Sequence, residues 1–254
     1  MPDSSTTPAF SVQVHAARVV FAGQPLFDDL DVRLPGGQWT CLLGPSGVGK
    51  STLLRHILGL EPGDGAGDAI ACSDGAPLAG RAAFMAQRDG LFPWLTVRQN
   101  VALGRRLRRQ PADDTATRAR IDAMLAAVGL DGNGGDLPAT LSGGMRQRAA
   151  LARTLMEDRP AVFMDEPFSA LDAITRIRVQ DLAARLLAGR TVLLVTHDPL
   201  EALRLGHRIH VMAGRPARLN PALIPAGAPP RRVDDPAVLE AQGQILRELA
   251  EAGA

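Results

Sequence analysis

A glycine-rich loop between an apolar stretch and a helical stretch constrains the fold of this chain more than any other feature. Residues 44–52 fit the pattern G-x-x-x-x-G-K-[S/T], and they lie between an expected strand at 39–43 and an expected helix at 52–60. The loop consists of Gly44, Pro45, Ser46, Gly47, Val48, Gly49, Lys50, Ser51 and Thr52. Glycines let backbone N–H groups turn inward as an anion nest, and the following helix points its positive end at the same place. The loop therefore predicts a phosphate-binding strand–loop–helix unit.

The loop also contains the only lysine of the chain. The sequence has 28 basic Lys and Arg residues, and all except Lys50 are arginine. A lysine that persists in such a composition indicates a place where a compact point charge fits and a planar guanidinium does not. We expect Lys50 to reach the β- and γ-phosphates of a nucleotide, and the Ser51 hydroxyl to bind Mg²⁺. A chance glycine-rich turn is the alternative, which the flanking strand and helix disfavour.

Composition excludes several classes of protein. The formal net charge of +1 argues against a general nucleic-acid binder, which needs a basic surplus. No apolar run approaches the ~18–20 residues that span a bilayer. The first ten residues read as a loose tail without the basic and apolar regions of a signal peptide. Two cysteines provide no disulfide framework, and Cys41, inside an apolar stretch, reads as a small hydrophobic residue.

Strand-like and helix-like segments alternate along the chain, which favours an α/β fold with a parallel sheet covered on both faces. The expected strands and helices are separated by glycine-rich breaks, and a linker precedes the last helix. A strand or strand pair is expected at 11–22, further strands at 82–86, 161–164 and 191–195, and short strands at 207–212 and in the region up to 220. Loops are expected at 61–68 and 131–138, helices within 96–158 and at 172–187 and 236–250, and the linker at 222–230.

Two further segments carry groups suited to phosphate chemistry. The apolar strand at 161–164 leads into Asp165 and Glu166, which predicts an Mg²⁺ contact for the first acid and water activation for the second. Two solvated loop acids are the alternative. Ser142 is a good helix N-cap, and Gly143 and Gly144 behind it leave backbone amides open, so either a second anion site or simple capping fits.

The run Leu-Ser-Gly-Gly-Met-Arg-Gln-Arg at 141–148 resembles the signature motif of the ATP-binding-cassette (ABC) family. Other family elements follow the expected order: Gln87 resembles the Q-loop glutamine, 169–172 the D-loop, and His197 the switch histidine. The resemblance implies a P-loop NTPase core with a mostly parallel sheet, an antiparallel N-terminal β part and a helical subdomain near 88–158. The ATPase domain would cover 11–220, followed by a linker and helix at 221–254.

The resemblance also implies a mechanism. Two copies would pair head to tail and enclose two Mg-ATP molecules, with Ser142, Gly143 and Gly144 of one copy completing the γ-phosphate site of the other. Glu166 would orient or deprotonate water, His197 would hold the γ-phosphate, and Gln87 would touch Mg²⁺ and report occupancy. Asp165 and Ser51 would hold Mg²⁺.

The segment after Gln87 resembles that of bacterial importers. The run Phe-Pro-Trp-Leu-Thr-Val at 92–97 is most similar to the nitrate/sulfonate/taurine group, with the hydroxymethylpyrimidine branch favoured within it. This implies an integral membrane permease as partner, a periplasmic or lipoprotein solute-binding protein as indirect partner, no nucleic acid, and a place on the cytoplasmic face of the inner membrane. A soluble cassette ATPase in translation or repair and a P-loop small-molecule kinase are the alternatives.

Two features depart from or add to the family pattern. Phe21 stands where the family usually has a tyrosine that stacks on adenine, so we expect it to stack on the base; a plain core residue is the alternative. The arginine cluster at 105–109 is read either as a solvated face or as a contact with lipid headgroups or a membrane partner.

Overall fold

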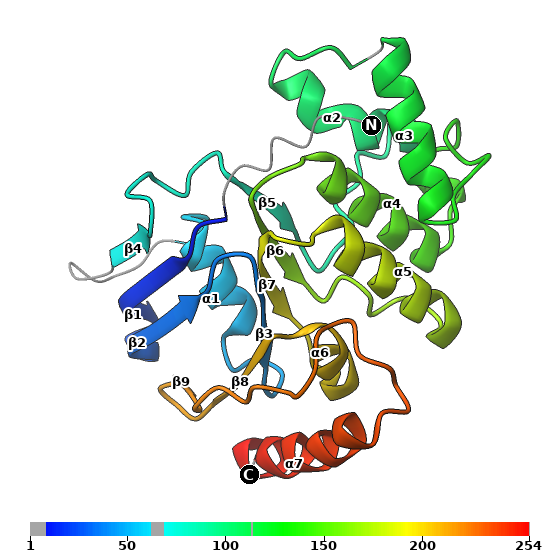
Figure 1. Cartoon of the computed structure of the whole chain (residues 1–254). Helices are drawn as coiled ribbons and strands as arrows, with labels where there is room; N and C mark the ends of the chain where they lie inside the picture. The colour runs from blue at the N-terminus through cyan, green and yellow to red at the C-terminus, as the bar shows by residue number, and fades with distance from the viewer. Residues whose placement is uncertain (1–8, 62–68, 113, 254) are drawn as a thin grey trace. The chain divides into compact units, whose positions relative to one another are not determined.

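The computed structural model describes residues 9–61, 69–112 and 114–253 (Figure 1). The chain divides into two compact units. Among the described residues, the first unit contains 9–61, 69–82, 159–165 and 188–253, and the second contains 83–112, 114–158 and 166–187. The tail expected at 1–10 and the loop expected at 61–68 lie almost entirely outside the described residues. No helix in the described ranges is long and apolar enough to cross a membrane.

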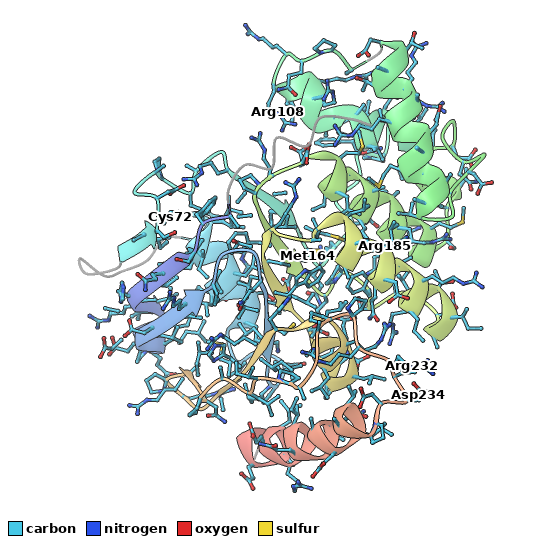
Figure 2. The ribbon with its side chains drawn as sticks, viewed as in Figure 1. Cys72, Arg108, Met164, Arg185, Arg232 and Asp234 are labelled. Atoms are coloured by element: carbon cyan, nitrogen blue, oxygen red, sulfur yellow. The ribbon has the colours of Figure 1, made fainter. Side chains whose placement is uncertain are left out.

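The core of the first unit is a mostly parallel sheet. Its strands β6 (Ala161–Asp165), β7 (Thr191–Val195), β3 (Trp39–Leu43), β8 (Arg208–Ala213) and β9 (Arg218–Leu219) neighbour one another in that order. The first four run parallel and β9 pairs antiparallel with β8. Every residue of β3, β6 and β7 is buried, including Met164 (Figure 2), which explains why their sequences are apolar without alternation.

A second, antiparallel sheet is formed by β2 (Gln24–Leu34), β1 (Val12–Phe21) and β4 (Ala69–Cys72), with β1 in the middle. Of the two readings of 11–22, a strand or a strand pair, the single strand is confirmed as β1, whereas β2 and β4 were not expected from the sequence. The pairing of β1 with β2 shifts register between Val14 and Val20, so the apolar alternation along these strands is interrupted.

Three helices complete the first unit. They are α1 (Lys50–Ile57), which follows the glycine-rich loop, α6 (Pro199–Leu205), which follows β7, and the C-terminal α7 (Pro236–Gly253). Helix α7 packs against α6 and β8, with Val238 and Ile245 buried at i, i+7 spacing. Helix α6 was missed from the sequence because it is only seven residues long.

The second unit is mainly helical. It starts within β5 (Ala82–Met85) and contains α2 (Val97–Leu107), α3 (Thr115–Ala127), a 3₁₀ turn at Pro138–Thr140, α4 (Gly143–Met156) and α5 (Ala173–Leu186). Helix α4 packs against both α2 and α3. Together the two units confirm the α/β fold class, with a mostly parallel sheet, an antiparallel N-terminal part and a helical part that contains the signature segment.

Candidate nucleotide-binding site

The glycine-rich loop connects β3 to α1, as its sequence predicted. Its first glycine is required by space and by backbone conformation: Gly44 has φ 153°, and a Cβ there would lie 2.4 Å from the main-chain oxygen of Met212 on β8. At Gly47, with φ 77°, a Cβ would meet nothing within 4 Å, so the outer side of the loop faces open space. The loop thus contacts the sheet closely at Gly44, whereas Gly47 in its middle faces open space.

Lys50 is the first residue of α1, and only 7% of it is exposed. Its Nζ donates hydrogen bonds to the carbonyl oxygens of Gly44 (2.7 Å) and Pro45 (2.9 Å). The side chain therefore folds back across the loop and puts its ammonium group inside the loop's curve. A positive charge at this position suits the binding of an anion by the loop.

Helix α1 begins without a side-chain cap. Its N-cap is Gly49, with φ 114° and no side-chain hydrogen bond. In the described part of the chain, every other α-helix begins with a side chain that accepts from an amide of the first turn: Thr96, Asp114, Ser142, Asp172, Asp198 and Asp235. The amides at the start of α1 are therefore positioned for an external acceptor, and their partial positive charge favours an anion.

Parallel pairing brings the ends of β6, β7 and β3 to one edge of the sheet. Asp165 pairs with Val195, and Val195 pairs with Leu42, just before the loop. At a strand spacing of about 4.8 Å, the backbones of Asp165 and Leu42 are about 10 Å apart. Asp165 is 4% exposed, whereas His197, two residues after β7, is exposed. The structure thus places both residues at the edge that carries the glycine-rich loop.

Hydrogen bonds of the residues on either side hold the backbone around His197 in place. The amide of Thr196 donates to Leu42 O (3.1 Å), and the Asp198 side chain accepts from the amides of Leu200 and Glu201 at the start of α6. His197 therefore lies between a residue tied to the strand before the loop and a helix cap.

Phe21 lies at the end of β1 and is 50% exposed, so it is not a core residue. It lines a pocket of about 170 Å³ together with Gly47 and Val48 of the loop and Arg215. Gln24, Pro25 and Leu26 complete the lining. An aromatic face beside the glycine-rich loop suits a nucleobase. Arg215 was not expected from the sequence, because no motif contains it and only folding brings it to Phe21.

The second unit holds the other predicted site residues. Gln87 is exposed two residues after β5, and Ser142 caps α4, its Oγ accepting from Met145 N (3.2 Å). Because the hydroxyl accepts from its own helix, its proton remains able to donate to an anion. Gly143 and Gly144 form the first positions of α4, and Glu166 is partly exposed in the turn after β6.

The thiol of Cys41, on the strand before the loop, is not available as a nucleophile. Cys41 on β3 is fully buried, and burial raises the pKa of its thiol, which keeps it protonated. This confirms Cys41 as a small hydrophobic residue.

The residues at the edge fit a nucleoside triphosphate with a divalent cation. The uncapped start of α1 and the Lys50 ammonium supply positive charge for phosphates. The Ser51 hydroxyl and the Asp165 carboxylate are hard oxygen donors of the kind Mg²⁺ binds, and Ser51 belongs to the same helix start as Lys50.

Comparison with known proteins agrees with this geometry. Residues 27–169 match the family model described as ABC transporter. An uncharacterized ABC transporter ATP-binding protein of Haemophilus influenzae is 40% identical over 94% of this chain and 98% of its own length. The aliphatic sulfonates import ATP-binding protein SsuB 1 of Pseudomonas savastanoi pv. phaseolicola is 40% identical over 96% of this chain and 98% of its own, and SsuB of Delftia acidovorans is 41% identical over 95% of each.

A solved structure shows the same fold. It is a dimeric ATP-binding cassette in a post-hydrolysis state bound to ADP and Pi, which is 26% identical and superposes with a TM-score of 0.74 over 85% of this chain and 100% of that one. The glycine-rich loop, the ordered motifs and these relatives agree, and the chain belongs to the ABC transporter family as an ATP-binding ATPase.

Proposed function

We propose that this chain is the ATP-hydrolysing subunit of a bacterial importer for sulfonates, working as a head-to-tail dimer beneath a membrane permease. The observation that carries the proposal is the uncapped helix α1 with Lys50 folded into the preceding loop, at the sheet edge that also holds Asp165 and His197. The names of the relatives from Pseudomonas and Delftia support the sulfonate assignment.

ATP binds through complementary charge and stacking. The amides of residues 44–52 and the Lys50 ammonium hold the phosphates, and the adenine stacks on Phe21 in the pocket beside the loop. Ser51 and Asp165 hold Mg²⁺, with Gln87 as a further ligand. When bound, Mg²⁺ neutralises negative charge on the phosphate oxygens.

Hydrolysis uses groups that follow two neighbouring strands. Glu166 accepts a proton from the attacking water as the water oxygen bonds to the γ-phosphorus and the bond to the bridging β–γ oxygen breaks. His197 donates a hydrogen bond to the γ-phosphate and holds it in line. The products are ADP and inorganic phosphate.

A second copy of the chain completes each site. Ser142 caps its own helix while its proton donates to the γ-phosphate of the partner copy, and the amides of Gly143 and Gly144 add further donors. The dimeric cassette with ADP and Pi supports this arrangement. ATP binding then closes the pair, and hydrolysis removes the contacts that hold it closed.

The importer assignment adds three partners and a location. A permease docks on the helical part of the chain, where Phe92 and Trp94 are exposed and pack edge to face. A periplasmic or lipoprotein solute-binding protein delivers the solute to the permease. The chain works at the cytoplasmic face of the inner membrane, and nucleic acid is not a partner.

The experiment is capture of the native assembly. The Glu166→Gln variant is tagged, held with Mg-ATP in solubilised native membranes, and its partners are identified by mass spectrometry. We expect a polytopic permease, and we expect its associated binding protein to prefer alkanesulfonates over nitrate and hydroxymethylpyrimidine in calorimetric titrations.

Other outcomes would redirect the assignment. Preference for the pyrimidine would move the chain to the branch favoured by its sequence, and recovery of soluble or ribosomal proteins alone would favour a cassette ATPase outside transport. ATP turnover that requires a small-molecule acceptor, without release of free phosphate, would indicate a kinase.

A further inference from the structure

One buried side chain from the start of α4 holds the turn that carries Glu166. Gln147, 6% exposed, donates from Nε2 to the carbonyl oxygen of Glu166 (3.0 Å) and to Ser169 Oγ (3.1 Å). Its Oε1 accepts from the amide of Ala170 (2.7 Å). Three of the four hydrogen-bonding positions of one amide group are therefore used on a turn of five residues.

Glu166 needs such support because its backbone is unfavourable for a side chain of its type. Its φ is +50°, in the left-handed region that a β-carbon disfavours. The Glu166 carbonyl oxygen accepts from Gln147 Nε2, from Ser169 Oγ (3.1 Å) and from the Ser169 amide (3.4 Å). These donors fix the peptide after Glu166, and so fix the direction in which its side chain leaves the main chain.

We propose that Gln147 is a positioning residue for ATP hydrolysis, which acts by holding the backbone of Glu166 in this left-handed conformation. The inference rests on the role of Glu166 in the proposed function and assigns no contact between Gln147 and ATP. A side chain that activates water must be placed within a fraction of an ångström, so loss of the backbone restraint lowers the rate of the chemical step more than the affinity for ATP.

The same contact joins two parts of the chain that serve different nucleotides. Gln147 lies one turn after Ser142–Gly144, which the proposed function assigns to the partner's ATP, whereas Glu166 acts on the chain's own ATP. A Cβ at Gly144 would lie 3.1 Å from Ala170 O, so the helix start and the turn are already in close contact. Direct contacts therefore link the start of α4 to the turn that carries Glu166.

The test compares Gln147→Leu with the control Thr154→Val in the full-length chain. Leucine is similar in size and removes all three hydrogen bonds. Thr154 is a buried residue of the same helix, and its hydroxyl donates only to Ala150 O (3.0 Å). We expect kcat to fall tenfold or more in Gln147→Leu, with KM and the Kd for Mg-ATP within twofold of the wild type, and the control to keep both values.

Combining Gln147→Leu with Glu166→Gln distinguishes loss of Glu166 positioning from a general disturbance of the structure. If Gln147 acts through Glu166, Gln147→Leu causes no further loss in single-turnover hydrolysis when Glu166 is already glutamine. Ser169→Ala removes an exposed hydroxyl that donates to Glu166 O and accepts from Gln147 Nε2, and it is expected to lower kcat severalfold without changing KM.

Three results would overturn the inference. They are kcat within twofold of the wild type in both Gln147→Leu and Ser169→Ala, a parallel loss of ATP affinity, or the same fold-loss in the Glu166→Gln background as in the wild type. If Glu166→Gln alone turns over ATP at the wild-type rate, the role given to Glu166 in the proposed function fails, and that failure is visible before any Gln147 variant is measured.

Discussion

Replacing Arg231 by methionine is expected to destabilise the chain by about 2–4 kcal/mol, although no site uses this residue. Arg231 is 5% exposed and donates to five carbonyl oxygens. The acceptors are Leu203 and Gly206 at the end of α6 and three residues of the preceding segment, Pro225, Ala226 and Gly227. Its own carbonyl and amide pair with Arg204, so the segment before α7 is joined to α6 in both directions.

The expected loss of stability depends on which of the hydrogen bonds of Arg231 water can replace. Only the bonds to Leu203 and Gly206 are fully buried, and at about 1.5–3 kcal/mol per charge-assisted bond they account for about 3–6 kcal/mol. Part of this is offset, because burial lowers the pKa of the Arg231 guanidinium and so shows that its charge is held at a desolvation cost. The difference leaves about 2–4 kcal/mol, which for a chain of this size is a fall in Tm of about 5–15 °C.

The assay is urea unfolding followed by circular dichroism, with limited proteolysis of the segment at 221–235. Arg232→Met is the matched control, since Arg232 is exposed and pairs only locally with Asp234 (2.8 Å; Figure 2). The control should leave the unfolding midpoint unchanged. A loss below about 1 kcal/mol in Arg231→Met, or an equal loss in the control, would show that the buried hydrogen bonds of Arg231 do not stabilise the chain.

Four further outcomes follow from the site. Lys50→Ala should weaken Mg-ATP binding about 30- to 150-fold. Lys50→Arg should not restore binding, because a planar guanidinium does not fit the loop. Near wild-type affinity of either variant in calorimetry would contradict the role given to Lys50. Phe21→Ala should weaken ATP binding about fivefold to tenfold and Phe21→Tyr less than twofold, so equal losses in both would remove the stacking role. Gly44→Ala should give insoluble or strongly destabilised protein, since its Cβ would lie 2.4 Å from a main-chain oxygen of β8, and a normal Tm would show that the loop can move away. His207 Nδ1 accepts from the Trp39 amide (3.1 Å), and burial, followed by the nearby Arg231 charge, lowers the His207 pKa below the ordinary 6.5. The contribution of His207 to stability is therefore present above pH 6.5 and is lost as the pH falls below it. His207→Gln should accordingly flatten the dependence of the free energy of unfolding on pH between about pH 7 and 5.

The elements that were predicted correctly are those whose function or burial leaves a short local pattern. The strands β3, β6 and β7 are buried along their whole length, so their apolar runs identify them without regard to neighbours. The strand β2 was missed because its exposed positions include Asp28, Asp29 and Asp31, and its pairing with β1 shifts register. Its strand character comes from the partner strand and not from its own residues.

The same distinction applies to the site residues. The loop at 44–52 and the acids after β6 are recognisable because their chemistry requires particular residue types at fixed spacing. Gln147 lies inside the signature run at 141–148, but the run gives no role for its side chain, because the groups that it holds follow β6 about 20 residues later. Arg215 and Arg231 carry no pattern at all, since pocket neighbours and backbone groups far away in the sequence define them.

The missing cap of α1 makes the nucleotide part of the folding energetics of this helix. In the other described helices the chain supplies its own acceptor at the first turn, whereas at α1 the proposed function gives that place to the phosphates of ATP. Amide hydrogen exchange in the first turn of α1 should therefore slow when ATP binds, while the capped start of α5 changes little. ATP binding would then supply the missing cap of α1, and product release would remove it. The apparent stability of this region should therefore rise with the ATP concentration.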